Sequence, residues 1–184
     1  MTLPGFTLVT GNPDKRREAE AALGHAVAVA AMDLPEIQSL DLLQVLDAKG
    51  EEAWKRLQRP LVVEETGLEL AALGGFPGPL VKWMLATIGA EGIAGLALAL
   101  GETRAVARCA LLYRDRDRQV VGQGETRGVL VLPPRGDGGF GWDPVFQPAG
   151  EERTYGELDP AAKVAIGHRG RAWRALAGKL ADGD

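Results

Sequence analysis

The chain has 184 residues, of which 46% are hydrophobic and 25% charged, and this composition predicts a single globular domain, 1–184, with a sizeable core. A net charge of −4 argues against a protein that coats nucleic acid. The single cysteine, Cys109, excludes an internal disulfide, and the longest apolar stretch, 92–101, is too short to cross a bilayer. Since no targeting segment is recognisable, we expect a cytoplasmic protein that binds neither membranes nor nucleic acid.

The N-terminal part of the chain predicts alternating strands and helices. Residues 6–10 are a strand candidate that runs into a Gly-Asn-Pro turn, and residues 27–31 are a second one. Between them we expect a helix, with Asn12 as its N-cap, Pro13 at its first position and Gly24 just past its end.

The middle of the chain continues this alternation. Apolar residues recur at helical spacing over 41–59, which predicts a helix that Pro60 ends. The apolar run 61–63 follows as a short buried strand, and two more helices are expected over 79–88 and 91–101.

The last part of the chain predicts two long strands, 104–113 and 120–132, that are joined by a turn at 115–117. A loop rich in glycine and proline, 133–148, separates them from a final helical region that begins at the N-cap Asp159. Together, these strands and helices indicate an α/β protein with a mixed sheet.

A phosphate-binding turn is predicted where the first strand meets the first helix. Free amides and the positive end of the helix dipole attract anions at such a junction, and a lysine in the first turn adds a charge. The glycine-rich lysine loop of ordinary NTPases is not matched. A capped structural turn is the alternative reading. The residues of this turn are Thr10, Gly11, Asn12, Pro13, Asp14 and Lys15.

Two carboxylates, Glu64 and Glu65, follow the apolar run, and we expect them at the edge of the sheet and on opposite faces. One of them can hold Mg²⁺, which accepts one or two protein carboxylates and takes its other ligands from water and substrate phosphates. The alternative reading is an ordinary acidic strand end.

Two later segments carry aromatic and basic side chains. In the loop 138–144, glycines let the backbone approach a ligand, and Phe140 or Trp142 can stack on a base. The alternative for this loop is a turn with its aromatic rings in the core. Further along, His168 and Arg169 offer donors for a carbonyl oxygen or charge for a phosphate, or they are ordinary surface or core residues.

In this order and over nearly the whole chain, these segments resemble the inosine triphosphate pyrophosphatase family. The most specific block is Phe-Gly-Trp-Asp-Pro-Val-Phe at 140–146. The other matching segments are Thr10-Gly11-Asn12 with Lys15, Pro35-Glu36-Ile37-Gln38, Leu73-Gly74-Gly75 with Pro77-Gly78-Pro79, Lys82-Trp83, Tyr155-Gly156-Glu157-Leu158, Lys163 and His168-Arg169-Gly170-Arg171-Ala172.

The resemblance implies a fold and an activity. The fold is a long central mixed sheet flanked by helices, with two lobes, the substrate cleft between them, and usually a homodimer. The activity is Mg²⁺-dependent hydrolysis of deaminated purine nucleoside triphosphates, namely ITP, dITP and XTP, to the monophosphate and pyrophosphate. Attack of water on the α-phosphorus needs positioning, charge neutralisation and a proton acceptor more than covalent help.

The resemblance also implies roles for single residues. The 10–15 turn and Lys49 would hold the triphosphate, with Lys82 and Thr66 as further substrate contacts. Glu65 would bind the metal and act as the general base. Phe140 would stack on the purine, and the backbone and side chains of Gly141, Trp142 and Asp143 would lie around it. The base and its 6-oxo group would be read by Lys163, His168 and Arg169.

Two departures from the family bear on the metal. Glu65 replaces the usual aspartate, and Leu40 stands where a second metal carboxylate is usual. The longer Glu65 would then reach the ion itself, with Glu64, Asp41 or Glu36 helping. Two other readings stay open, a weakened homologue that binds purine nucleotides without turnover and an enzyme for another nucleotide, such as a modified pyrimidine triphosphate.

Overall fold

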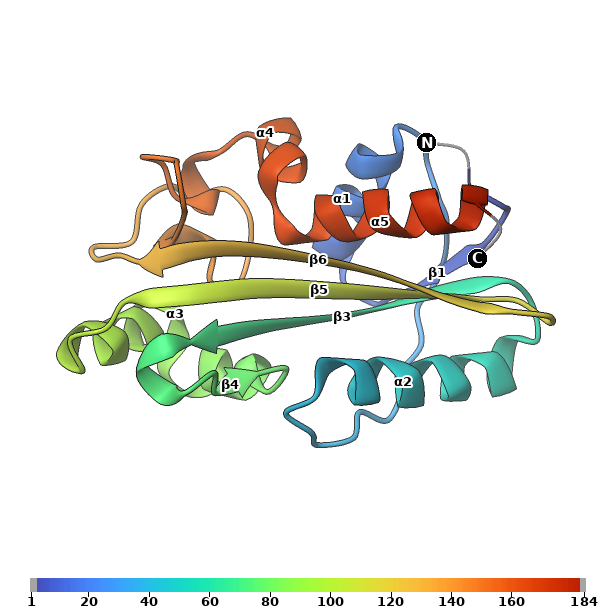
Figure 1. The fold of residues 1–184 in the computed structure, drawn as a ribbon, viewed down its shortest axis with the longest axis horizontal. Coiled ribbons are helices and arrows are strands. Elements are labelled where there is room, and N and C mark those ends of the chain that lie inside the picture. Colours follow the sequence, from blue (N-terminus) through green and yellow to red (C-terminus); the bar gives the residue numbers. More distant parts are fainter. Residues whose placement is uncertain (1–2, 183–184) are drawn as a thin grey trace.

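The computed structural model describes residues 3–182, which are built around a mixed seven-stranded sheet (Figure 1). The strand order is β2-β1-β3-β5-β6-β7, with β4 paired to β3 off this path. β1 runs parallel to β2 and β3, and the other pairs are antiparallel, which confirms the predicted α/β class with a mixed sheet. The strands are β1 (Thr7–Val9), β2 (Ala28–Ala30), β3 (Leu61–Leu70), β4 (Pro77–Gly78), β5 (Arg104–Arg114), β6 (Gln119–Leu130) and β7 (Phe146–Pro148).

The helix α1 (Pro13–Leu23) connects β1 to β2 and has the ends that local sequence signals predict. The side chain of Asn12 caps its first amides, and Pro13 takes the first position, where no amide donor is needed. Gly24 ends the helix with a φ of 79°, a left-handed conformation that suits glycine. The expected boundaries are confirmed.

Helices cover both faces of the sheet (Figure 1). α2 (Leu42–Leu57) begins after its N-cap Asp41 and packs Leu46 and Ala53 against one face. α1, α4 (Pro160–Ile166) and α5 (His168–Asp182) lie on the other face, where Trp173 is fully buried. The final helical region is thus two helices that meet at Gly167.

The strand β3 is longer than predicted. It continues through ten residues to Leu70, because Leu68 and Leu70 pack in the core and β5 pairs with β3 along its whole length. β1 pairs with the other edge of β3 only as far as Val62, and β4 joins that edge at Leu68. In the described part of the chain, no strand pairs with this edge of β3 between Val62 and Leu68. The sheet is therefore open beyond the carboxyl end of β1, which is where open α/β sheets usually bind ligands.

A second lobe surrounds the carboxyl ends of β3 and β6 and the amino end of β5, which lie side by side. Its core joins α3 (Val81–Ala99) to the short helices η2 (Asp143–Val145) and η3 (Tyr155–Glu157). The expected loop 133–148 therefore contains regular structure, namely η2 and β7.

The helix α3 replaces the two helices expected in this region and is broken inside. Gly89 interrupts it with φ 67° and ψ 176°, so its two halves correspond closely to the predicted pair. By length and composition alone α3 is apolar enough to cross a membrane. Its second half, however, packs Ile93, Ala94 and Ala97 into the core of the second lobe.

Candidate active site

The turn between β1 and α1 is a capped helix start beside a cavity. Thr10 Oγ1 accepts the amide of Asn12 at 3.1 Å. Asn12 Oδ1 accepts the amides of Asp14 at 2.8 Å and Lys15 at 3.4 Å. The side chain of Asn12 therefore already accepts hydrogen bonds from two of the backbone amides that we expected to bind a phosphate. Thr10, Gly11 and the Lys15 side chain line the adjoining cavity, so ligand contacts of this turn fall to them.

This cavity, called the lysine cavity below, has a volume of about 300 Å³ and is lined by lysine side chains from three helices. Lys15 comes from α1, Lys49 from α2 and Lys82 from α3, while Glu36 and Glu64 form part of the wall. Three carboxylates, of Asp33, Glu36 and Glu64, also line the cleft, so the three lysines offer donors for a polyphosphate without giving the lining a net positive charge. The structure thus brings the predicted turn together with Lys49 and Lys82.

Glu64 and Glu65 lie on opposite faces of β3, as predicted, but in the middle of the strand and not at its end. Glu64 turns toward α1 and α5, where its carboxylate is 3.3 Å from Lys15 Nζ and 3.0 Å from Arg169 Nε. Glu65 turns toward α2 and forms an ion pair with Lys49. The expectation that the strand ends at these residues was wrong, because β3 continues to Leu70, and both carboxylates are buried.

Lys49 lies between two carboxylates. Its Nζ is 2.9 Å from Glu36 Oε1, pairs with Glu65 and is 3.4 Å from the backbone oxygen of Glu64. Burial alone would lower the pKa of Lys49, but Glu65 and Glu36 outweigh it and raise the pKa above its ordinary value of 10.5. Lys82 Nζ is 3.4 Å from the other oxygen of Glu36. Glu36 and Glu65 therefore converge on one positive charge.

A row of alternating charges runs from the lysine cavity to the first residue of η2. Each cation in it contacts a carboxylate on either side, except at the ends, and most of its members are buried. Burial of charges is tolerated when each is paired in this way. The members in order are Lys15, Glu64, Arg169, Glu18, Lys163 and Asp143.

Glu18 is the member of this row that the sequence did not predict. Its carboxylate accepts from Lys163 at 2.5 Å and also pairs with Arg169. Burial would raise the pKa of Glu18, but the charges of Arg169 and Lys163 lower it below 4.5, so the group is ionised near neutral pH. Glu18 also lines the cavity that contains Phe140 and Lys163.

This Phe140 cavity, of about 170 Å³, has one aromatic wall and cations behind it. Lys163 Nζ lies 4.9 Å and Arg169 Cζ 5.2 Å from the centre of the Phe140 ring. Asp143 fixes the loop by accepting the Phe140 amide at 2.6 Å. At Gly139, φ is 72° and a side chain would collide with Asp143, which explains why the loop needs glycine there. A flat ring carrying oxygen acceptors suits this cavity.

Trp142 and His168 pack behind the cavity as part of the core. Both are buried, with ring centres 6.3 Å apart, and Tyr155 lies 5.8 Å from His168 on another side. Within residues 3–182, neither ring nitrogen of His168 has a hydrogen-bond partner. Burial, and then the charge of Arg169, lower the pKa of His168 well below 6.5, so its ring is neutral. For Trp142, the structure agrees with the alternative of an aromatic ring in the core.

The remaining predicted residues lie at or near the metal candidates. Asp41 caps α2, with its carboxylate accepting the Leu43 amide at 2.8 Å, and Leu40 is 64% exposed. Thr66 donates its amide to Glu65 Oε1 at 3.2 Å. The carboxylate that lies opposite Glu65 across Lys49 is that of Glu36, one of the three that we expected to help Glu65 hold the metal.

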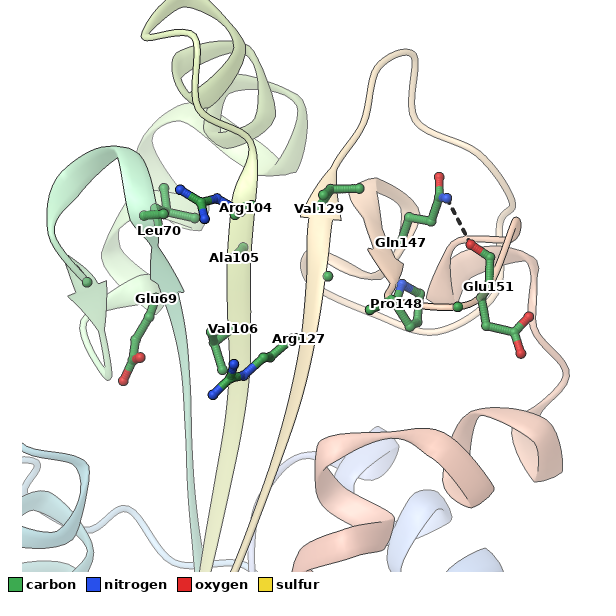
Figure 2. A pocket seen from close by; sticks show the side chains of 15 residues that line it. Glu69, Leu70, Arg104, Ala105, Val106, Arg127, Val129, Gln147, Pro148 and Glu151 are labelled. Atoms are coloured by element: carbon green, nitrogen blue, oxygen red, sulfur yellow. Dashed lines mark hydrogen bonds between the residues drawn. The ribbon is translucent and has the colours of Figure 1, made fainter.

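A larger cavity lies at the other end of the sheet. It is a groove of about 610 Å³ lined by residues of β3, β5, β6 and β7, with Val106 and Val129 among them (Figure 2). The charges at its rim, such as Glu69 and Arg127, have partners of opposite sign. Since the groove lacks a helix start and a cluster of cations, we assign the candidate site to the smaller lysine and Phe140 cavities.

Comparisons with known proteins identify relatives that match nearly the whole chain. A HAM1 protein from Coxiella burnetii has the same fold, with a TM-score of 0.80 and 24% identity over 98% of this chain and 100% of that one. A nucleoside-triphosphatase, or dITP/XTP pyrophosphatase, from Mycobacterium abscessus is 30% identical, with a TM-score of 0.68 over 92% of this chain and 97% of that one.

Sequence relatives cover almost the full length as well. Inosine triphosphate pyrophosphatase 2 of Trypanosoma cruzi is 42% identical over 92% of this chain and 89% of its own length. A dITP/XTP pyrophosphatase of Ignicoccus hospitalis is 38% identical over 94% of both chains. A sequence model of the Ham1 family matches residues 6–179, and the chain therefore belongs to the Ham1 family.

Proposed function

We propose that the chain hydrolyses deaminated purine nucleoside triphosphates, namely ITP, dITP and XTP, to the monophosphate and pyrophosphate, and so cleanses the nucleotide pool. The observation that carries this proposal is the row of ion pairs that joins the lysine cavity to the Phe140 cavity. A nucleotide has the same two parts, a polyphosphate and a flat base. The names of the relatives at 42% and 38% identity support the choice of substrate.

In this proposal, the lysine cavity holds the triphosphate. Lys15, Lys49 and Lys82 approach it from three directions, so they can neutralise and orient the phosphates. Thr10 and Gly11, which line the same cavity, would contact the phosphates through the hydroxyl and the backbone.

The side chains around Lys49 fit Mg²⁺. Glu36 and Glu65 converge on one ammonium, and Mg²⁺ accepts one or two carboxylates while water and phosphate oxygens supply the rest. No group of three or more metal-binding side chains occurs within residues 3–182. When bound, the ion would polarise the phosphate oxygens and neutralise developing charge. Glu65 is then also in place to accept the proton of the attacking water.

The Phe140 cavity would recognise the base by its edge. A 6-oxo purine presents an oxygen acceptor beside the N1–H donor, whereas adenine presents an amino donor beside an unprotonated N1. Lys163 lines the cavity and offers donors, Arg169 lies behind it against Phe140, and the ionised Glu18 next to them offers only acceptors. Donors beside an acceptor are complementary to the edge of a 6-oxo purine. They face the amino group and the unprotonated N1 of adenine with groups of the same kind. A required hydrogen bond of this kind can give discrimination of roughly 10⁴–10⁵.

The reaction products test the proposed function. Phosphorus NMR of ITP incubated with the protein and Mg²⁺ is expected to show pyrophosphate and the monophosphate. Orthophosphate alone would contradict the proposed bond cleavage. Tight binding of ITP without products would favour the weakened homologue, and faster hydrolysis of pyrimidine triphosphates would favour another substrate.

Glu18→Gln is expected to weaken the preference for ITP over ATP. The side-chain amide of the introduced glutamine can donate to the adenine N1, and the hydrogen bond from the N1–H of hypoxanthine to a carboxylate is lost. Loss of one such matched contact corresponds to roughly 10-fold in the ratio of kcat/KM values. Steady-state assays with both nucleotides measure this ratio.

The matched control is Glu20→Gln on the same helix. Glu20 pairs with Arg16 on the outer side of α1, so its replacement should leave the ratio unchanged. If Glu18→Gln lowers the rates with ITP and ATP equally, Glu18 only supports the structure of the cavity and does not read the base.

We propose a single pyrophosphatase domain over 1–184 that acts in the cytoplasm as a homodimer, without nucleic acid or membrane partners. Light scattering at micromolar concentration measures the mass in solution, and a monomer would contradict the homodimer.

A further inference from the structure

The ammonium of Lys49 is surrounded by oxygens like a bound cation. Glu36 Oε1 lies at 2.9 Å and the backbone oxygen of Glu64 at 3.4 Å, while the Glu65 carboxylate forms the third contact. The side chain of Lys49 is 9% exposed, so it is held inside the protein and does not extend into solvent. Lys82 is the only other lysine that pairs with Glu36 in the described chain, and its side chain is 69% exposed.

Lys49 and a divalent cation cannot both occupy the space between Glu36 and Glu65. The two carboxylates are the ligands that Mg²⁺ prefers, and Lys49 now neutralises part of their charge. A second positive ion at this short distance would be repelled by the ammonium, strongly so in a partly buried site.

We propose that Lys49 is a place-holder for the metal, which keeps Glu36 and Glu65 together and excludes divalent cations until a triphosphate enters. This inference rests on the proposed function and extends it to the order of binding. Lys49 also lines the lysine cavity, so an entering triphosphate offers its ammonium a second set of oxygens. Movement of the ammonium toward the phosphates then frees the two carboxylates for the metal that accompanies the nucleotide.

The test measures metal binding without nucleotide or turnover. Electron paramagnetic resonance reports free Mn²⁺ during titration of the nucleotide-free protein. We expect Lys49→Met to bind Mn²⁺ at least 10-fold more tightly than the wild type. Lys55→Met is the matched control, because Lys55 lies on the same helix, pairs with Glu52 at 3.8 Å and is mostly exposed. This control should bind Mn²⁺ as weakly as the wild type.

A second variant guards against poor folding of the first. Lys49→Gln is neutral but can still donate hydrogen bonds to Glu36 and Glu65, so it should fold and show the same tightening. Adding Glu36→Gln to either variant should remove the gain in Mn²⁺ affinity. If both folded variants bind Mn²⁺ no more tightly than the wild type, the inference is overturned. Lys49 would then organise the site without competing with the metal ion for it. Since the assay needs no hydrolysis, this failure is distinct from absence of pyrophosphate release by the wild type.

Discussion

Glu65→Gln is expected to reduce the turnover of ITP at least about 100-fold, the lower range for loss of a positioned general base. The carboxylate of Glu65 is one of two that converge on Lys49, and glutamine provides neither its negative charge nor its basicity. Nucleotide affinity in EDTA should change little, because the lysines that would hold the triphosphate stay in place. Single-turnover kinetics and equilibrium binding separate these two effects.

The same strand offers a control for Glu65→Gln. Glu69 lies four residues further along β3 on the same face and pairs with Arg108 at 2.7 Å, away from the lysine cavity. Glu69→Gln should keep the wild-type turnover. If the Glu65 variant remains as active as this control, the proton acceptor is another group, and Glu36 is the nearest candidate across Lys49.

Local signals were enough to predict the elements whose ends depend on neighbouring residues. Asn12, Pro13 and Gly24 act within one turn of the helix they bound, and α1 runs from Pro13 to Leu23. The length of β3 could not be predicted in this way. Glu64 and Glu65 look like the end of an apolar strand, and they are accommodated in its middle only because Arg169 and Lys49, from other elements, neutralise them.

The candidate site was predictable where its residues form a motif. The turn at 10–15 and the loop at 138–144 are contiguous, so their composition is visible in the sequence. Glu18 is different, because its partners Lys163 and Arg169 are 145 and 151 positions away. A glutamate on an exposed-looking helix carries no local sign of such contacts. Only the packing of α1 against α4 and α5 shows that Glu18 belongs to the cavity.

Arg169→Met is expected to destabilise the folded protein by about 3–5 kcal/mol, the usual cost of removing one partner of a buried ion pair. Arg169 is 3% exposed and is the only bridge between the carboxylates of Glu64 and Glu18 within residues 3–182. Methionine fills much of the space but leaves both groups without this charge. For a domain of this size the melting temperature should fall by roughly 6–20 °C, which calorimetry or circular dichroism measures at pH 7.

The pH dependence of this deficit identifies its electrostatic cause. In the wild type, the lowered pKa of Glu18 stabilises the fold above pH 4.5, and this contribution is lost as the pH falls through the folded-state value. In Arg169→Met, burial acts on Glu18 with one cation fewer, so its folded-state pKa rises and protonation relieves the cost. The difference in melting temperature should therefore be largest near pH 7 and narrow toward pH 4. Arg171→Met, which removes an exposed arginine from the same helix, should show a small difference at every pH. A deficit for Arg169→Met that stays constant with pH would instead assign the loss to packing.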